Sequence, residues 1–344
     1  MPALPRRFRV VRIDREREMG RVDAQLRAWG GDLAVLPDGT PEDVLTRATA
    51  DAELLLTCYA RITRQVLAGA PKLRAVVKYG VGIDTIDLEA ARSLRIPVVN
   101  VPAYAEETVA EGAFMLLMAL FKQVKPIQRA MQADGWVWPE SRWLGHDLAG
   151  KTVGLVGLGR IGRRMARLAE AFRMQVLASN PGLSQADAPP GVQLFDDLDA
   201  MIQRCDVVSI HCVLNATTRH LIGATQIGLM KPGAFLVNVS RGEIVDETAL
   251  VRALAQRRIA GAALDVYGRE PLTSAGHPMS ALYAMDNVLL WPHLTFYTHE
   301  AMRRLEDETL ARSREALEGG PVTVVSRDSR LRSQIHGVRF ADAP

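Results

Sequence analysis

The sequence predicts an α/β fold made of two doubly wound parallel-sheet domains with a cleft between them. Three observations support this prediction. The chain of 344 residues is longer than one typical domain. Short β-branched runs alternate with helical patterns, which is typical of parallel strands joined by helices. The Gly- and Pro-punctuated segment ADGWVWPESRWLGHDLAG (133–150) interrupts the alternation once, and the alternation then begins again.

The first series of elements runs from the amino end to residue 101. Its predicted strands are the apolar runs at 8–13, 33–37, 53–59, 72–80 and 97–101. Helical patterns lie at 20–29, 41–50 and 88–94, and a long helix is predicted over 106–131. Parallel strands need such crossover helices, so this series predicts the first sheet.

The second series begins after the interruption. Its predicted strands lie at 152–158, 174–179, 207–212, 234–240, 261–267 and 287–292, with a helix over 246–258 between two of them. Several of these strands are apolar throughout, as expected of a sheet covered by helices on both faces. A last helix, 298–317, is expected to return the chain to the first domain, and the strand 321–325 after it has no partner nearby in sequence. We therefore expect one domain of residues 1–102 with 294–344, and a second of residues 103–293.

The overall charge argues against a nucleic-acid-binding protein. Lysine and arginine number 42 and aspartate and glutamate 39, which gives a formal net charge of +3. A balance so close to neutral creates no strong field for a polyanion. The arginine-rich stretches 6–18 and 326–340 are interpreted as solvated, partly frayed chain ends without a functional role.

Cysteine usage and hydropathy indicate a cytoplasmic protein. Cys58, Cys205 and Cys212 lie in or beside apolar runs without CxxC spacing, which predicts buried thiols and neither a disulfide nor a metal site. The charged first residues are unlike a signal peptide. The most apolar run, 112–121, has about half of the ~20 residues that span a bilayer, so it is interpreted as a buried helix and no membrane association is expected.

A glycine motif near the middle of the chain predicts a dinucleotide site. The stretch VGLVGLGRIG puts Gly157, Gly159 and Gly162 between a predicted strand and a predicted helix. These glycines allow a tight turn and a close approach of the backbone to a pyrophosphate at the helix N-terminus. The next strand is followed by Asn180, where such domains usually carry an acid that binds the adenine ribose and disfavours NADP. We predict a Rossmann domain that prefers NAD, with NADP use left open.

Three charged side chains, Arg241, Glu270 and His293, each follow a predicted strand of the second series. Because ligands bind at the carboxyl ends of parallel strands, these side chains are placed to converge on a bound cofactor. Taken singly, Arg241 could pair with Asp246, and His293 could be a satisfied loop histidine. Glu270 could cap the turn before Pro271. Together with the glycine motif, the three predict a catalytic set.

The chain resembles the D-isomer-specific 2-hydroxyacid dehydrogenases over nearly its whole length. The motifs that carry the resemblance are KYGVGIDTIDLEAA, VNVPAYAEETVAE, VGLVGLGRIG, VSIHCVLNATTRHLI, KPGAFLVNVSRGEIVDE, GAALDVYGREP and NVLLWPH. The resemblance implies a flavodoxin-like substrate domain, a Rossmann cofactor domain, NAD as the cofactor and a small 2-oxo or 2-hydroxy acid as the substrate. It also implies a homodimer, whose interface we expect around the apolar helix 112–121.

The resemblance implies a role for each matching residue. His293 looks like the general acid/base, Glu270 like its carboxylate partner, and Arg241 like the cation that binds the substrate's carboxylate and carbonyl. The backbone amides of Val81 and Gly82 look like a second carboxylate cradle. The residues expected to bind the cofactor, with a purely structural role left open for His211, are Thr108, Gly157, Gly159, Arg160, Ile161, Gly162, Asn180, His211, Cys212, Val213, Thr217, Val239, Ser240 and Asp265.

These residue types suit the reduction of a 2-oxo acid. The reaction needs a hydride on the carbonyl carbon and a proton on the carbonyl oxygen, and an imidazolium is suited to give that proton near neutral pH. A carboxylate at Glu270 would orient the ring and favour its charged form. The planar guanidinium of Arg241 is suited to grip a carboxylate with two hydrogen bonds.

The residues after His293 bear on the substrate and on the class of protein. The stretch LTFYTHEAM replaces the family's usual Gly-rich continuation and looks like the branch that holds D-lactate dehydrogenases and the C-terminal-binding-protein corepressors. Phe296 is expected to face an apolar substrate side chain of modest size. Lys78 is either a further cation for the substrate carboxylate or a surface lysine with its charge in water. The alternative to an enzyme is a corepressor-like, NAD(H)-sensing interaction protein.

Overall fold

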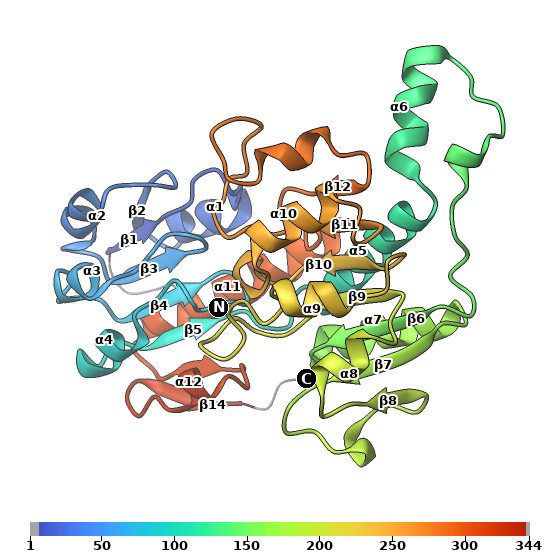
Figure 1. Cartoon of the computed structure of the whole chain (residues 1–344). Helices are drawn as coiled ribbons and strands as arrows, with labels where there is room; N and C mark the ends of the chain where they lie inside the picture. The colour runs from blue at the N-terminus through green and yellow to red at the C-terminus, as the bar shows by residue number, and fades with distance from the viewer. Residues whose placement is uncertain (1–6, 342–344) are drawn as a thin grey trace. The chain divides into compact units, whose positions relative to one another are not determined.

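The computed structural model describes residues 7–341, which divide into two compact units (Figure 1). Unit 1 comprises the chain up to Ala105 and from Thr298 onward, and unit 2 comprises Glu106–Tyr297. The divisions therefore follow Ala105 and Tyr297, whereas the sequence led us to expect them after residues 102 and 293. Arg6, the first residue of the arginine-rich N-terminal stretch, lies outside the described residues.

Unit 1 is built on a five-stranded parallel sheet in the order β2-β1-β3-β4-β5. The strands are β1 (Phe8–Arg12), β2 (Gly31–Val35), β3 (Leu54–Thr57), β4 (Ala75–Lys78) and β5 (Val98–Asn100). This 2-1-3-4-5 order is that of the flavodoxin-like doubly wound fold. Every residue of β3, β4 and β5 is buried, as expected of strands with helices on both faces.

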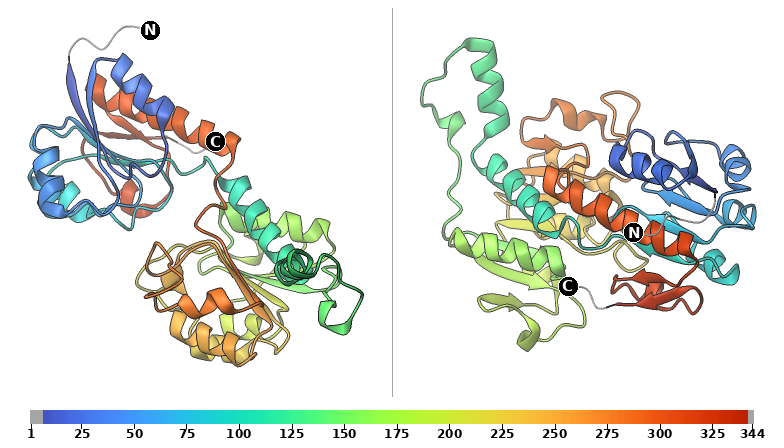
Figure 2. Two further views of the ribbon diagram at one scale, coloured as in Figure 1. Left: turned by 90° about the horizontal axis from the view of Figure 1, so that it is seen from above. Right: turned by 180° about the vertical axis from the view of Figure 1, so that it is seen from behind.

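The helices of unit 1 come from both ends of the chain, as the blue and red segments of Figure 2 show. They are α1 (Gly20–Ala28), α2 (Glu42–Thr49), α3 (Arg64–Ala68), α4 (Leu88–Ser93), α11 (His299–Glu318) and α12 (Ser329–Arg332). The hydroxyl of Thr298 caps α11 by accepting from the Ala301 amide, and Gly319 ends it in the left-handed region. Because α11 packs against α1, β3 and β4, the last long helix belongs to unit 1.

Unit 2 is built on a seven-stranded parallel sheet in the order β8-β7-β6-β9-β10-β11-β12. The strands are β6 (Thr152–Val156), β7 (Gln175–Ser179), β8 (Val192–Leu194), β9 (Val207–Ile210), β10 (Phe235–Asn238), β11 (Gly261–Leu264) and β12 (Val288–Leu290). Counted from β6, the first six strands have the 3-2-1-4-5-6 order of dinucleotide-binding domains, and β12 adds an edge strand.

Two layers of helices cover this sheet. They are α5 (Glu106–Phe121), α7 (Arg160–Ala171), α8 (Leu198–Ile202), α9 (Ala224–Leu229) and α10 (Glu247–Ala255). Helix α6 (Val124–Asp134) has no buried residue and lies outside these layers, and single 3-10 turns lie at Ser141–Trp143, Gln185–Asp187, Gly242–Ile244 and Ser280–Ala284. One apolar core contains residues of α5 and α7, and the other contains residues of α8, α9 and α10. Apolar packing on both faces explains why the strands read as continuous hydrophobic runs.

The register of unit 2 aligns the carboxyl ends of its central strands. Val156 of β6 pairs with Ile210 of β9, and Ile210 pairs with Asn238 of β10. Asn238 pairs with Leu264 of β11, and Leu264 with Leu290 of β12. The residue that follows each strand therefore leaves the sheet at the same edge, so the motifs separated along the sequence are brought together there.

Three sequence predictions are wrong in the described structure. The long helix expected over 106–131 is two helices, because Gln123 adopts a left-handed conformation between α5 and α6. The C-terminal strand β13 (Val322–Val324) is partnered, since it pairs in parallel with β14 (Val338–Phe340). The arginine-rich stretches are not frayed ends over their described parts: β1 lies in the first, where Arg12 is buried, and α12 and β14 lie in the second.

Between residues 7 and 341, no helix is both long and apolar enough to cross a membrane. One side of the most apolar helix, α5, packs against the rest of unit 2. Its buried residues include Phe114, Leu117 and Phe121, which contribute to a core of unit 2.

Candidate active site on unit 2

The glycine loop between β6 and α7 has the shape that a pyrophosphate requires. Gly157 has a φ of +101°, and a Cβ built on it would lie 2.6 Å from the Cys212 amide nitrogen. A Cβ on Gly162 would lie 2.2 Å from the carbonyl oxygen of Gly157. Apart from its chain neighbours, no atom of the described residues lies within 4 Å of a Cβ built on Gly159, the residue before α7. The loop is thus open in front of a helix N-terminus, and these residues fit a dinucleotide.

Asn180 braces this loop. Its side-chain oxygen accepts a hydrogen bond of 2.9 Å from the Leu158 amide, between the first two glycines of the motif. Its side-chain nitrogen lies 3.3 Å from the Pro181 carbonyl oxygen. The Asn180 oxygen that was expected to bind the adenine ribose is therefore already hydrogen-bonded to the glycine loop, and it connects the end of β7 to that loop. No negative charge stands there to repel a 2′-phosphate.

The arginines near the loop are held by other groups. Arg160 pairs with Glu106 of α5 at 2.8 Å, and Arg164 pairs with both Glu106 and Glu107. Arg163 donates to the carbonyl oxygen of Asp187. Because Glu106 is buried and engages Arg160, a swing of Arg160 toward a 2′-phosphate would break an ion pair inside unit 2.

The segment after β9 packs against the glycine loop. The Ser209 hydroxyl lies 2.9 Å from Nε2 of His211, and burial lowers the pKa of His211 to about 4, so its ring is neutral at pH 7. The Cys212 backbone approaches Gly157 closely, and its carbonyl accepts from the Ser240 hydroxyl. The structure thus gives His211 and Cys212 a packing role beside the loop.

The other residues expected to bind the cofactor differ in how far they are buried. Val213 is exposed, and Thr217 is exposed with its hydroxyl 2.8 Å from Asn215 Oδ1. Ile161 and Val239 are half-buried against the core that contains α5, and Thr108 on α5 is buried. Contact of these residues with a cofactor stays a prediction.

His293 and Glu270 form an ion pair at the carboxyl edge of the sheet. Nδ1 of His293 lies 2.9 Å from Oε2 of Glu270, and Oε1 of Glu270 accepts from the Tyr267 amide at 3.0 Å. Although burial raises it, the pKa of Glu270 lies below its ordinary value because His293, the Tyr267 amide and Arg241 all favour the carboxylate. Glu270 is therefore ionised at neutral pH, and it contacts His293 through Nδ1 of the ring.

Arg241 is carried on a neighbouring loop that packs tightly on the Glu270 loop. A Cβ on Gly242 would lie 2.0 Å from the Tyr267 carbonyl carbon, so only glycine permits this approach. The Arg241 guanidinium donates to the Ser240 carbonyl at 2.7 Å. The carboxylate of Asp246, which the sequence left open as a partner of Arg241, caps α10 by accepting from the Ala249 amide.

Asp265 holds the turn that carries His293. It is 1% exposed, and its carboxylate accepts from the Leu294 amide at 2.8 Å and from the Thr295 amide and hydroxyl. Burial raises the pKa of Asp265, although these hydrogen bonds oppose the rise. Thr295 was not predicted from the sequence, where its only signal was a hydroxyl two positions after His293. Asp265 is thus a positioning residue in this structure, and its contact with the cofactor stays a prediction.

Phe296 packs beside His293. Its side chain is 6% exposed, and the two rings meet edge to face with centroids 6.1 Å apart. The turn is also pressed against α5, since a Cβ on Gly112 would lie 2.6 Å from Thr295 Cβ. Both contacts restrain the backbone around His293, whose φ of +57° is left-handed.

The expected substrate-binding residues of unit 1 follow or end β4. Lys78 is 5% exposed, so the interpretation as a surface lysine with its charge in water is wrong. Val81 is exposed and Gly82 is half-buried, and the Val81 carbonyl accepts from the Asn100 side chain at 2.6 Å.

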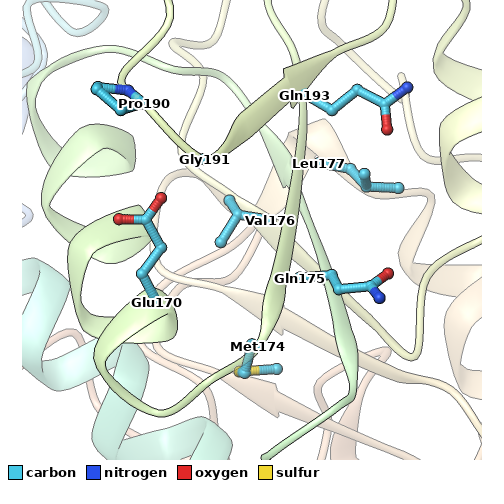
Figure 3. Close-up of a pocket in the computed structure, with 8 residues that line it drawn as sticks. All are labelled: Glu170, Met174, Gln175, Val176, Leu177, Pro190, Gly191 and Gln193. Carbon is cyan, nitrogen blue, oxygen red and sulfur yellow. The ribbon is translucent and has the colours of Figure 1, made fainter.

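A hollow of about 570 Å³ in unit 2 is separate from these residues (Figure 3). Its lining residues are Glu170, Met174, Gln175, Val176, Leu177, Pro190, Gly191 and Gln193. Gln175 begins β7, so this hollow lies at the amino ends of the strands, away from the glycine loop. It is no part of the candidate active site.

Comparisons with known proteins agree with the geometry. A family model described as "D-isomer specific 2-hydroxyacid dehydrogenase, NAD binding domain" matches residues 114–295. Glyoxylate reductase of Thermococcus litoralis is 34% identical over 301 residues, covering 85% of this chain and 89% of that protein. (S)-sulfolactate dehydrogenase of Chromohalobacter salexigens is 36% identical over 295 residues, covering 83% of this chain and 92% of that protein.

Among solved structures, the chain is similar to D-lactate dehydrogenase of Aquifex aeolicus, solved in complex with NAD and lactic acid. The TM-score is 0.81 with 28% sequence identity, and the match covers 90% of this chain and 96% of that one. The likeness therefore extends over both units.

Proposed function

The chain belongs to the D-isomer-specific 2-hydroxyacid dehydrogenase family and is an NAD-dependent oxidoreductase, and we propose that Arg241, Glu270 and His293 carry out its chemistry. The observation that carries the proposal is the ion pair between His293 and Glu270, at the same sheet edge as the glycine loop. The reaction interconverts a small 2-oxo acid and its D-2-hydroxy acid. Nothing in the comparisons favours the corepressor-like alternative.

The chemistry divides among the three side chains. When bound, the nicotinamide cofactor supplies the hydride to the carbonyl carbon. Charged His293 gives the proton from Nε2 to the carbonyl oxygen, since Nδ1 faces Glu270. Ionised Glu270 stabilises the imidazolium and holds its orientation. Arg241 binds the substrate carboxylate and polarises the carbonyl. In the oxidation direction, neutral His293 accepts the same proton.

We assign the two units different tasks. Unit 2 would be the cofactor domain, because it holds the glycine loop and the 3-2-1-4-5-6 strand order. Unit 1 would be the substrate domain, with the Val81 and Gly82 amides binding a carboxylate. Asp265 would act mainly by holding the His293 turn through Leu294 and Thr295.

We also propose that the protein is a homodimer. Helix α6 and the segment after it extend away from the rest of unit 2 (Figures 1 and 2). On this segment Trp136 and Trp138 are 64% and 72% exposed, and Leu144 is also exposed. Apolar side chains gathered on such a projection are typical of a protein interface. A second copy would cover them, next to the buried helix α5 that the sequence indicated.

A cytoplasmic setting is proposed from the thiols. Cys58, Cys205 and Cys212 are all free. Burial raises the pKa of Cys205 to about 12 and that of Cys212 to about 11, which keeps both as unreactive thiols. Such residues suit a reducing compartment.

The proposed function is tested by incubating the protein with NADH and a panel of 2-oxo acids. The panel includes glyoxylate, pyruvate, hydroxypyruvate and longer apolar acids. We expect loss of NADH absorbance with at least one of them, and a product of D configuration by chiral chromatography. If neither NADH nor NADPH is consumed with any 2-oxo acid, the proposal is wrong.

A further inference from the structure

Tyr267 lies in unit 2, between the loop that carries Glu270 and the segment that carries His293. It follows the end of β11 by three residues, and its side chain is only 7% exposed. Burial raises the pKa of Tyr267, so its hydroxyl keeps its proton at neutral pH and can donate a hydrogen bond. Because a buried hydroxyl is normally hydrogen-bonded, its partners identify the segments that Tyr267 connects.

The Tyr267 hydroxyl bridges the ends of two neighbouring strands. It lies 3.0 Å from the carbonyl oxygen of Leu264, the last residue of β11, and 3.0 Å from that of Trp291, the residue after β12. The Leu264 carbonyl also accepts from the Trp291 amide at 2.8 Å. The Trp291 carbonyl belongs to the peptide bond with Pro292, and His293 comes next. The hydroxyl therefore restrains the chain just before His293.

The backbone of Tyr267 contacts the segments of the two other residues in the proposed catalytic set. Its amide donates to Oε1 of Glu270 at 3.0 Å, which orients the carboxylate. Its carbonyl carbon would lie 2.0 Å from a Cβ built on Gly242, the residue after Arg241. One buried residue thus touches the chain at or beside all three side chains.

The hydroxyl contact complements the contacts of Asp265 on the other side of His293. Asp265 holds the two residues after His293 by accepting from the amides of Leu294 and Thr295. With the Tyr267 hydroxyl before it, the turn is restrained on both sides. Such restraint is needed because His293 has a φ of +57°, a left-handed conformation that costs energy for a residue other than glycine.

We propose that Tyr267 is a positioning residue whose hydroxyl keeps Nδ1 of His293 against the carboxylate of Glu270. The amide of Tyr267 orients the carboxylate, and its hydroxyl orients the segment that carries the ring, so the 2.9 Å contact between them is set by a single residue. The inference rests on the proposed function, because it concerns how the proposed acid is held for proton transfer.

The experiment is a double-mutant cycle between Tyr267→Phe and Glu270→Gln. Phenylalanine keeps the ring and the amide and removes only the hydroxyl. We expect kcat for the best 2-oxo acid to fall by about tenfold, because a displaced acid is less effective. KM should change little. In Glu270→Gln the contact has already lost its charge, so the same substitution should lower kcat by less than about threefold.

Two measurements separate positioning from a general loss of stability. Fluorescence titration gives the number of NADH sites per chain, and kcat divided by this number corrects for any unfolded fraction. Tyr283→Phe is the matched control. The Tyr283 hydroxyl lies 3.3 Å from the Leu272 carbonyl oxygen, in the chain that follows Glu270. Its removal should leave kcat per NADH site near that of wild type.

Two outcomes would overturn the proposal. If Tyr267→Phe lowers kcat by the same factor with and without the Glu270 carboxylate, the hydroxyl does not act on the pair. If kcat per NADH site does not fall, the hydroxyl does not position His293. Either result leaves the proposed function intact, since the wild type still reduces a 2-oxo acid. A wild type that reduces none would contradict the proposed function, and this inference with it.

Discussion

Nδ1 of His293 lies 2.9 Å from Oε2 of Glu270, and the other oxygen of the same carboxylate accepts from the Tyr267 amide. The second contact fixes the carboxylate, so the first fixes the imidazole ring. The pKa of Glu270 lies below its ordinary value, which keeps the carboxylate charged throughout the range in which a histidine titrates. The pair thus sets a charged, fixed carboxylate against Nδ1 of the imidazole ring.

Replacement of Glu270 by Gln should shift the pH profile of reduction downward. Reduction needs the protonated acid and falls as pH rises through its apparent pKa. Without the negative charge the imidazolium is less favoured, so the fall should begin roughly one pH unit lower or more. The measurement is the catalytic efficiency of reduction against pH. Glu318→Gln, in unit 1, is the control. An unmoved profile would count against the pair.

The margin between NADH and NADPH should widen in Asn180→Asp. The aspartate keeps an oxygen for the Leu158 amide and adds a charge that repels a 2′-phosphate. Wild type should still prefer NADH, because Arg160 is engaged with Glu106. The ratio of efficiencies with the two cofactors on one substrate measures this. Asn287→Asp adds the same charge before β12, at the opposite edge of the sheet, and should leave the ratio alone. A wild-type ratio in favour of NADPH would refute the assignment.

Truncation of Phe296 should change the size of the accepted substrate. Its ring is buried beside His293, so Phe296→Ala leaves space next to the acid. We expect a relative gain for bulkier 2-oxo acids over glyoxylate, whatever the charge of their side chains. The readout is the ranking of catalytic efficiencies across the panel. If the ranking does not change, Phe296 does not face the substrate.

Light scattering at micromolar concentration should give the mass of a dimer. The double substitution of Trp136 and Trp138 by Ser removes two exposed aromatic rings from the projecting segment and should yield monomer. Tyr283→Ser, which removes an exposed aromatic outside that segment, should remain dimeric. A monomeric wild type would end the dimer proposal.

Six of the seven strands described in unit 2 were predicted from the sequence, because burial on both faces gives a continuous apolar run. The three-residue edge strand β8 was missed, since Val192 is its one fully buried residue. The convergence of Arg241, Glu270 and His293 followed from the parallel order, since residues after parallel strands share an edge. The family motifs then named the chemistry. Local patterns and the motifs were sufficient for these features.

Features that depend on contacts between residues far apart in the sequence could not be predicted from local patterns. Arg17 looked like one more surface arginine, but it is 8% exposed and its guanidinium donates to Sγ of Cys58, 41 residues away. Thr295 bonds Asp265, 30 residues away. The break between α5 and α6 was not predicted, because Gln123 adopts its left-handed conformation without a proline or glycine at that position.

The most direct test of the account is the catalytic efficiency of His293→Gln, measured beside its affinity for NADH. Glutamine cannot deliver a proton as an imidazolium does, so reduction of the best 2-oxo acid should fall by ~10² to 10⁴. The dissociation constant for NADH, followed by fluorescence titration, should stay nearly the same because the glycine loop is untouched. An efficiency within a few-fold of wild type would show that His293 is not the acid.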